Sequence, residues 1–177
     1  MAVVPASHTF SSGTVATSSE ANTYIRDPIA FLLNRPIANL RQTVVQSIAN
    51  AAGVAITFDA EDFDTANGHD NVTNNSRYTA VYAGRYLLGG GVSYAANATG
   101  VRGAYWYVNG STVAGTEVII PASGGGIVTS VPARSVLTFL NVGDYVELIA
   151  YQTSGGALNT GVTGGGQSSA SVEWVSN

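Results

Sequence analysis

The chain has 177 residues, of which 45% are hydrophobic and only 10% are charged, and its formal net charge is −4. This length fits one domain with or without an ordered extension, and the acidic balance argues against nucleic acid as a partner. Because the sequence contains no Cys, disulfides, thiolate metal sites and cysteine nucleophiles are excluded. All seven basic residues are Arg, which is favoured over Lys in ordered interfaces, although a GC-rich genome produces the same bias.

The N-terminal residues, Met-Ala-Val-Val-Pro-Ala-Ser-His, lack the basic segment and the apolar segment of a secretory signal peptide. The apolar runs of the chain are too short to span a bilayer. We therefore expect a soluble chain with no membrane partner and no export through that signal. Residues 1 to 17 are small and polar, which predicts an extended arm or a turn.

A short helical region is predicted over residues 19 to 34. Ser18 or Ser19 is suited to cap its first turn, and Asp27-Pro28 repeats the arrangement of a cap followed by Pro at the first helical position. The region is therefore either two short helices or one kinked helix, and it ends before Pro36. A helix this short is not stable alone, so we expect it to dock on the rest of the chain or on another protein.

Residues 37 to 52 fit neither the helical nor the strand period cleanly, and their β-branched content favours an extended connector. Strand signals dominate from Gly53, where Val54, Ile56 and Phe58 alternate with small or polar residues. An acidic loop follows over residues 59 to 70.

The stretch from Arg77 to Asn97 contains neither Pro nor an acidic residue. In its second half, one face carries Tyr86, Leu88, Val92 and Tyr94, which is the period of a strand. Gly84 predicts a bend between two strands, which we expect to pair at the centre of a sandwich. The run Gly89-Gly-Gly91 predicts that another part of the structure comes close to the backbone there.

Further strands are predicted over residues 101–108, 113–120, 136–140, 145–151 and 169–175, with Trp174 on an inward phase. Asn109-Gly110 is a strong hairpin-turn signal. Eight or more short strands with regularly spaced turns indicate a sandwich or a jelly roll. Tyr105 and Tyr107 must face away from Trp106, so one of these faces belongs to the core and the other to a subunit interface or a sugar-binding surface.

The acidic loop is the first place to look for a metal. Its carboxylates are weak candidate ligands for Ca²⁺, and they are Asp59, Glu61, Asp62, Asp64 and Asp70. Their spacing does not match an EF-hand loop, which needs Gly sixth and Glu twelfth. A solvated or interface loop is the favoured interpretation, and we predict neither a metal nor a cofactor.

Catalytic groups are sparse in the sequence. His69 and Asp70 are adjacent, but the other His is His8 in the arm, and neighbours in sequence are not a pair in space. No Gly-x-Ser-x-Gly motif is present to hold a serine nucleophile. The carboxylates of the acidic loop do not establish the paired geometry of a glycosidase, so we do not predict an enzyme.

Several short motifs occur in an informative order. They are Gly84-Arg-Tyr86, Val92-Ser-Tyr94, Tyr107-Val-Asn-Gly110, Val136-Leu-Thr-Phe-Leu140 followed by Gly143-Asp-Tyr-Val146, and Ser168-Ser-Ala-Ser-Val-Glu-Trp174. Together they resemble the C1q/TNF-like jelly-roll family, over residues 54 to 175. The resemblance implies a compact homotrimer and an all-β jelly-roll sandwich of about 8–10 strands. It also gives two parts: a short helical N-terminal arm in residues 1–52 and the jelly roll in residues 53–177.

The resemblance also suggests where subunits meet. We expect the trimer interface or the core to include Tyr86, Gly89, Gly90, Gly91, Tyr94, Tyr105 and Tyr107. The glycine run then has a candidate reason, which is close approach of the backbone near a three-fold axis.

The N-terminal part has a narrower resemblance. Ser-Glu-Ala-Asn-Thr-Tyr-Ile-Arg-Asp-Pro-Ile-Ala-Phe-Leu-Leu, ending at Leu33, resembles the opening of virion proteins from tailed phages of actinobacteria. Pro28 departs from that pattern, and no collagen-like stalk is present, which excludes a complement-like role. The resemblance implies that the arm anchors the chain to the virion through Tyr24, Ile25, Ile29, Phe31, Leu32 and Leu33.

The expected function is therefore that of a structural protein on the virion surface, assembled in the host cytoplasm. As a minor tail or receptor-binding protein, it would contact other phage structural proteins and host surface glycans, the latter through loops 121–126 and 154–167. The alternative is a capsid decoration or head-fibre protein that stabilises the head.

Overall fold

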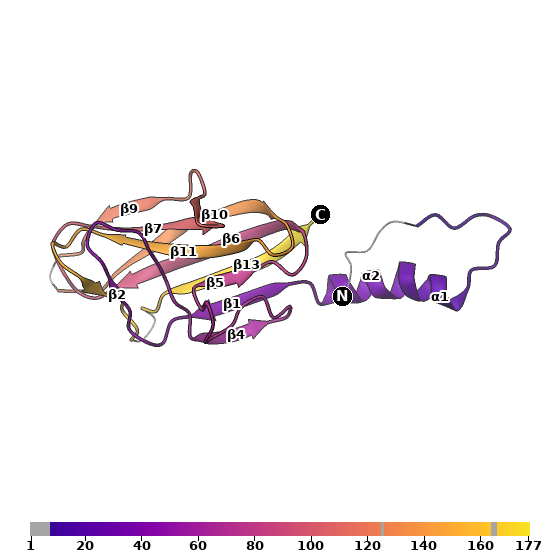
Figure 1. Ribbon diagram of the computed structural model, residues 1–177, viewed down its shortest axis with the longest axis horizontal. Helices are drawn as coiled ribbons and strands as arrows, with labels where there is room; N and C mark the ends of the chain where they lie inside the picture. Colours follow the sequence, from indigo (N-terminus) through magenta and orange to yellow (C-terminus); the bar gives the residue numbers. More distant parts are fainter. Residues whose placement is uncertain (1–7, 125, 164–165) are drawn as a thin grey trace.

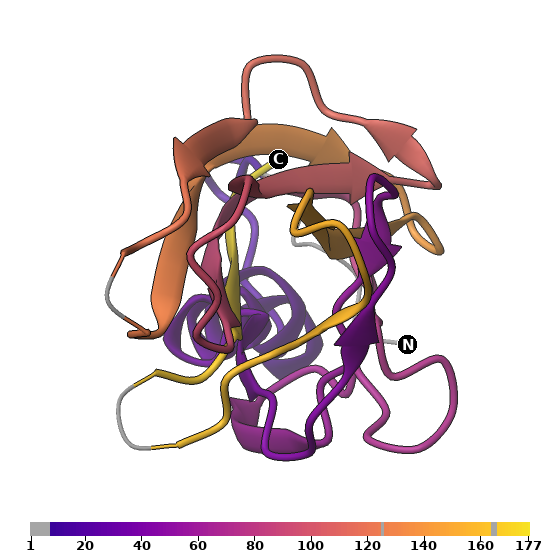
Figure 2. The ribbon, with the colours of Figure 1, turned by 90° about the vertical axis from the view of Figure 1, so that its left-hand side faces the viewer.

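The computed structural model describes residues 8–124, 126–163 and 166–177. Two antiparallel β-sheets face each other, and a helical arm extends from one end of the resulting sandwich (Figure 1). Figure 2 looks along the sandwich from the end opposite the arm and shows the two layers. The predicted all-β sandwich with a short helical arm is confirmed.

The first sheet has five strands in the order β10 (Thr129–Leu140), β6 (Gly84–Tyr94), β13 (Ser169–Ser176), β1 (Ile37–Arg41) and β4 (Ala60–Asp64). Pro132 lies inside β10, which forms an edge of this sheet. At an edge, the missing N–H of Pro removes no ladder hydrogen bond.

The second sheet is built around β11 (Tyr145–Gln152) and β7 (Val101–Val108), which pair along their length. β11 also pairs with β3 (Val54–Ala55) and β5 (Arg77–Thr79). β7 also pairs with β8 (Ser111–Thr112) and β9 (Val118–Pro121). A separate small sheet joins β2 (Ser47–Ile48) to β12 (Leu158–Asn159).

The core lies between the two large sheets and follows the predicted alternation. On β6 the inward residues Tyr86, Leu88, Val92 and Tyr94 are buried, while Leu87 points outward and is exposed. The facing sheet contributes Trp106, and Trp174 lies on the inward face of β13 as predicted. This core fixes which side chains are left on the outer faces of the sandwich.

The stretch 77–97 does form two strands, but they do not pair with each other. β5 belongs to the second sheet and β6 to the first. Gly84 stands between them at φ +152°, and a Cβ there would lie 2.2 Å from Nε1 of Trp174. Glycine is therefore required at the point where the chain crosses from one sheet to the other.

The close approach predicted at the glycine run is present within a single chain. A Cβ on Gly90 would lie 2.6 Å from the carbonyl oxygen of Ser169 and 3.3 Å from Cζ2 of Trp106. A Cβ on Gly91 would lie 3.1 Å from the carbonyl oxygen of Val131. Neighbouring strands and an indole ring thus explain these two glycines without a symmetry axis.

The expected connector over residues 37–52 is not irregular throughout. β1 occupies its first residues and lies between β13 and β4. Ala38 and Leu40 are buried there, whereas Val44 and Val45 are exposed. The sandwich therefore begins at Ile37 instead of Gly53, and the helical arm ends before it. The acidic loop is likewise shorter, because its first part forms β4.

The helical arm runs without a break through α1 (Ser18–Ala21), the π-helical turn η1 (Asn22–Arg26) and α2 (Asp27–Leu33). Its N-cap is Thr17, which forms a capping box with Glu20, instead of the expected Ser18 or Ser19. Pro28 lies in the first turn of α2. Of the two predicted alternatives, two short helices or one kinked helix, the structure has one continuous helical segment that contains a π-helical turn.

Candidate functional site

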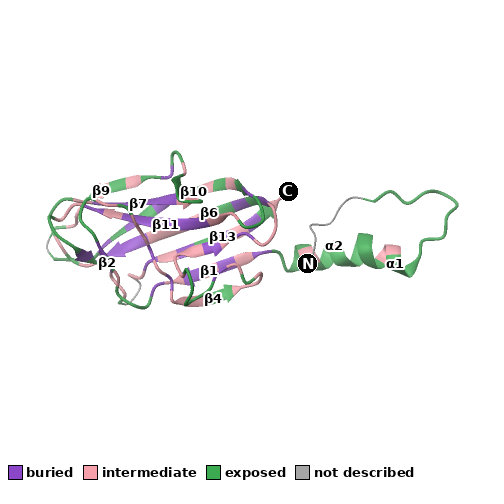
Figure 3. Ribbon diagram, viewed as in Figure 1, coloured by how far each residue is buried: buried purple, intermediate pink, exposed green. Residues whose placement is uncertain are grey.

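Most residues of the arm are exposed (Figure 3), and several of them are apolar. All the predicted anchor residues except Phe31 are exposed, from 37% for Tyr24 to 83% for Leu33; the others are Ile25, Ile29 and Leu32. Among the described residues, no helix is long and apolar enough to cross a membrane. An exposed apolar stripe of this kind marks a protein interaction surface.

The base of the arm is fixed to the sandwich by Phe31. Its ring contacts Tyr82 and Trp174 edge-on, with centroids 5.2 Å and 5.0 Å away. Trp174 is held in turn, because its Nε1–H donates to the carbonyl oxygen of Ala83 over 3.1 Å. Arg35 and Glu173 form an ion pair beside this contact. Phe31 therefore docks the arm on the sandwich, while Ile25, Ile29, Leu32 and Leu33 stay exposed and the Tyr24 ring stacks on His8 with centroids 3.8 Å apart.

A second apolar surface lies on the outer face of the five-stranded sheet. We call it the outer patch, and it consists of Phe63, Leu87, Leu137, Phe139 and Val175, which are 41–53% exposed. Leu137 lies directly opposite Leu87 in the β10–β6 register. A hollow of about 320 Å³ on this face is lined by Phe63, Leu87 and Gly89, among others. Arg35 and Glu173 also line this hollow and pair with each other between Phe63 and Leu87, so the outer patch is an apolar surface crossed by one ion pair. Exposed apolar residues gathered on one face are a candidate interface.

The predicted interface residues are divided between the core and two outer faces. Tyr86 and Tyr94 are fully buried, and Gly89 lines the hollow of the outer patch. Tyr105 and Tyr107 lie on the outer side of the second sheet with ring centroids 5.5 Å apart. A Cβ on Gly53 would lie 2.4 Å from the Tyr105 hydroxyl, so the segment around Gly53 covers this tyrosine.

The carboxylates of the predicted acidic loop have separate partners. Asp62 pairs with Arg41 over 2.7 Å, and Asp64 accepts the backbone N–H groups of Ala66 and His69. Asp70 accepts from the N–H groups of Thr73 and Val72, which lower the pKa of its carboxyl. Within the ranges that the structure describes, no three His, Cys, Asp or Glu side chains gather as a metal site would require.

Asp59 serves to fix the segment after β1. Partial burial alone would raise the pKa of its carboxyl, but hydrogen bonds from the Thr43 hydroxyl and from the N–H groups of Thr43 and Val44 hold it below its usual value. These donors belong to residues close behind Arg41 in sequence. The carboxylate therefore has a structural role in connecting β1 to the loop before β4.

His69 is buried and does not pair with Asp70. Its Nδ1 lies 2.8 Å from Oε1 of Glu61, and its Nε2 lies 3.1 Å from the carbonyl oxygen of Asn75. The ring also meets Phe58 edge-on. The histidine thus ties the 65–76 loop to β4, and the remaining candidate ligand, Glu61, is engaged in that contact.

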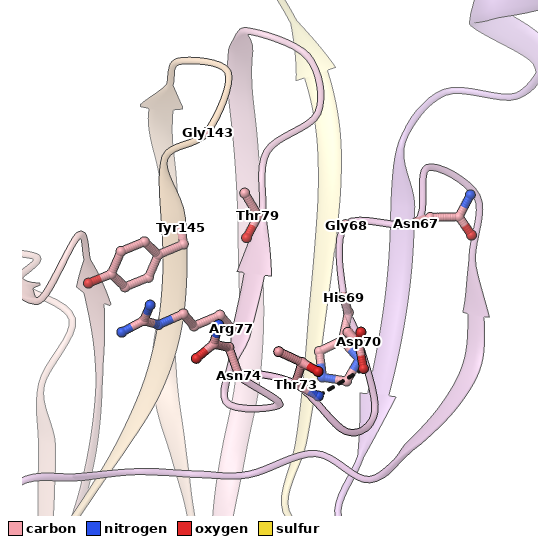
Figure 4. Close-up of a pocket in the computed structure, with 10 residues that line it drawn as sticks. All are labelled: Asn67, Gly68, His69, Asp70, Thr73, Asn74, Arg77, Thr79, Gly143 and Tyr145. Atoms are coloured by element: carbon pink, nitrogen blue, oxygen red, sulfur yellow. Dashed lines mark hydrogen bonds between the residues drawn. The ribbon is translucent and has the colours of Figure 1, made fainter.

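A polar surface pocket of about 380 Å³ lies beside this loop (Figure 4). The loop supplies one wall, and β5 with the start of β11 supplies the other. The lining residues are Asn67, Gly68, His69, Asp70, Thr73, Asn74, Arg77, Thr79, Gly143 and Tyr145. Sequence reasoning singled out His69 and Asp70 but not Arg77 or Tyr145, which β5–β11 pairing brings together.

Comparison with known proteins addresses the fold. No protein-family model matches the sequence, and no curated protein matches it. Among solved structures, murine APRIL at pH 8.5 matches with a TM-score of 0.57 and 13% identity, over 78% of this chain and 98% of that chain. Eiger TNF from S. frugiperda matches with a TM-score of 0.53 and 13% identity, over 81% and 95%. The fold is a TNF-like jelly roll.

The jelly roll places the candidate surfaces at different positions. The arm leaves one end of the sandwich, where β1 begins, and the loops that follow β6 and β11 lie at the other end (Figure 1). The outer patch lies on one broad face of the sandwich, and four of its five residues are on the half nearer the arm. The sequence could have predicted this patch. A strand with one solvated face normally carries polar residues on that face, but Leu87, Leu137 and Phe139 alternate onto the outer face and are apolar.

Proposed function

We propose that this chain is a structural protein on the surface of a tailed-phage virion, displayed as a homotrimer and acting as a minor tail or receptor-binding protein. One observation carries the proposal: a helical arm with exposed apolar side chains leaves one end of the jelly roll, and long loops lie at the other end. The arm suits attachment to another phage structural protein. The opposite end then faces outward.

The trimer is proposed to form through the outer patch. Its five apolar residues lie on the one broad face of the first sheet, next to small residues such as Gly89 and Ser171. Small residues allow close approach of backbones, and the apolar side chains supply the burial that drives association. This placement replaces Tyr86 and Tyr94, which are occupied in the core.

The outward loops are proposed to contact host surface glycans. Segment 121–126 begins at the last residue of β9, and segment 154–167 follows β11 and includes the short strand β12; both lie at the end away from the arm. Residues 125, 164 and 165 of these predicted loops lie outside the described residues. The proposed role is non-enzymatic, with assembly in the host cytoplasm.

The experiment that tests the proposal locates the chain on the particle. A reconstruction of the virion, or gold-labelled antibody against the chain, should place it at the tail, and purified chain should block adsorption of the phage to host cells. A location on the head, with loss of head stability when the chain is deleted, would favour a decoration or head-fibre protein instead. Absence from purified virions would overturn both.

A further inference from the structure

The polar pocket beside the 65–76 loop has two unlike walls. Arg77 and Tyr145 stand on one wall, on adjacent strands of the second sheet, and Asn67 and Asp70 stand on the other (Figure 4). Its volume of about 380 Å³ falls within the roughly 300–1,000 Å³ typical of small-ligand sites. A ligand that spans it meets a cation at one end and amide or carboxylate groups at the other.

The guanidinium of Arg77 is held in place and retains free donors. It stacks over the Tyr145 ring, 4.0 Å from the centroid, and its Nε–H donates to Oε1 of Glu147 over 3.1 Å. Ser76 donates to the same oxygen. Among the hydrogen bonds of the described residues, none uses the Nη groups of Arg77. These groups are oriented before a ligand arrives, and they match the geometry of a carboxylate.

The rest of the pocket offers amide, hydroxyl and carboxylate groups for the hydroxyls of a ligand, and Asn74 lies beside Arg77 (Figure 4). Asn67 and Asn74 adopt the left-handed region at φ +53° and +52°, and within the described ranges their side-chain amides hold no hydrogen bond. Thr73 likewise has a free hydroxyl there. Asp70 uses Oδ1 for two backbone N–H groups and retains Oδ2 as an acceptor.

The loop that forms this wall is rigidly attached. The Thr79 N–H donates to the Gly68 carbonyl oxygen over 2.7 Å, and a Cβ on Gly68 would lie 2.5 Å from the Tyr78 ring. The buried ring of His69 bonds to Glu61 and Asn75. The wall therefore exists before binding, which reduces the entropic cost of binding a ligand.

We infer that this pocket binds a sugar that carries a carboxylate, with the carboxylate on Arg77 and the sugar hydroxyls on Asn67, Thr73, Asn74 and Asp70. Arg77 also pairs with Glu147, and Asp70 lines the same pocket, so the site suits a singly charged group and disfavours phosphate, which carries nearly two charges. The inference rests on the proposed contact with host glycans and names their chemical class. The pocket lies on the side of the sandwich nearer the arm, beside the Gly143 turn, so it adds a glycan contact away from loops 121–126 and 154–167.

The test is titration of the purified full-length chain with two matched tetrasaccharides, followed by calorimetry or by chemical shifts. One is the hyaluronan tetrasaccharide, which alternates glucuronate with N-acetylglucosamine; the other is chitotetraose, which is all N-acetylglucosamine and neutral. We expect the acidic sugar to bind and the neutral one to bind at least about tenfold more weakly, because it lacks the charge-assisted hydrogen bond.

Variants locate the binding. Arg77→Gln should weaken binding of the acidic tetrasaccharide about tenfold or more, whereas Arg134→Gln, an exposed arginine on β10, should leave it unchanged. Asn74→Gly removes the amide, and glycine tolerates the left-handed backbone at this position. It should weaken binding of the acidic tetrasaccharide several-fold, and it provides a second test if Arg77→Gln does not fold. Three results would overturn the inference. The first is equal affinity for the two sugars, and the second is no binding at millimolar sugar. The third is that Arg77→Gln and Asn74→Gly bind the acidic tetrasaccharide as tightly as the unchanged chain does.

The test separates this inference from the proposed function. A chain that occupies the tail and blocks adsorption, but ignores the acidic tetrasaccharide, removes only the ligand assignment. A chain that binds the acidic tetrasaccharide through Arg77, but is absent from virions, removes the virion role and leaves the sugar site.

Discussion

Arg102 is completely buried at one end of the sandwich, and no described carboxylate pairs with it. Its Nη1 donates to the carbonyl oxygens of Thr99 and Val101, and its Nη2 donates to that of Asn97, over 2.9–3.0 Å. Desolvation lowers the pKa of its guanidinium, but the carbonyl dipoles favour the charge. The side chain therefore closes the loop between β6 and β7 from the inside.

We predict that Arg102→Met lowers the free energy of unfolding by about 1–3 kcal/mol, because it removes the donor of the Asn97 and Thr99 carbonyl oxygens and leaves that of Val101 with only the Thr153 N–H. Methionine keeps much of the apolar stem, so the loss reports mainly on hydrogen bonding. Urea denaturation of the full chain measures the effect. Arg134→Met, at an exposed position, is the control and should change stability by less than about 0.5 kcal/mol. Equal losses in the two variants would remove the role assigned to Arg102.

The turn before β11 makes the stability of the fold depend on pH through the Asp144 carboxyl. The Asn109 amide, then the N–H and amide of Asn141, hold the pKa of the Asp144 carboxyl below its usual value. A carboxyl with a lowered folded-state pKa contributes stability above its unfolded pKa, and that contribution is lost as the pH falls through the folded pKa.

We therefore expect the melting temperature to fall as the pH decreases from about 5 to about 2, and to fall less steeply in Asp144→Asn. At pH 7 the variant should lose less than about 1 kcal/mol, because the group is exposed. Thermal unfolding monitored by circular dichroism at several pH values tests this. Parallel melting curves for the two proteins across the acid range would contradict the assignment.

At the level of elements, the helical arm depends on one docking contact. Phe31 is its partly buried side chain against the core cluster, and helices this short are marginal without tertiary packing. Phe31→Ala should speed hydrogen exchange of the amides in residues 18–33 by at least about tenfold, since it removes the contacts with Tyr82 and Trp174. Ile29→Ala, an exposed position on the same helix, should leave exchange nearly unchanged. Equal protection in both variants would show that another contact holds the arm.

The elements predicted from the sequence were those with strong local alternation. β6, β7, β11 and β13 were located because apolar and small residues repeat with a period of two. β1 was missed since its partners in β13 are more than a hundred positions away, as in the Leu40–Ala170 pair, and only Ala38 and Leu40 mark its buried face. Local periodicity also could not show that β5 and β6 lie in different sheets, because pairing is a long-range property.

The candidate sites were predicted to a similar extent. The predicted anchor residues of the arm are exposed except Phe31, which faces the sandwich, and their role in attachment stays a prediction. The polar pocket could not be predicted from the sequence, because Arg77 and Tyr145 become neighbours only through the pairing of β5 with β11. The outer patch could have been predicted from Leu137 and Phe139, because their spacing puts both on the outward face of β10.

At the level of the whole molecule, association through the outer patch is testable by charge. We predict that Leu87→Arg together with Leu137→Arg converts a trimer to monomers, because like charges directly opposite on adjacent strands leave no apolar contact and repel across the interface. Sedimentation velocity at micromolar concentration measures the mass. Val72→Arg, at an exposed loop position, is the control and should remain trimeric. If the unchanged chain sediments as a monomer, the proposal of a trimer is wrong.

The arm and the patch should act independently. Replacing Ile25, Ile29 and Leu32 by Ser removes exposed apolar surface without touching the core, so the trimer should keep its mass and its melting temperature within about 2 °C. Incorporation into virions, measured by immunoblot of purified particles, should fall at least about tenfold. Full incorporation of this variant would assign attachment to another surface.

The place of β13 in the first sheet has a consequence for folding. β13 lies between β6 and β1, so before it is inserted the sheet consists of two separate pairs, β10 with β6 and β1 with β4. Each pair then presents an open strand edge, the kind of edge that recruits other chains. Insertion of one strand between two preformed pairs is a slow, long-range event. Removal of residues 169–176 would therefore leave two ribbons that cannot form one sheet, each with an open strand edge.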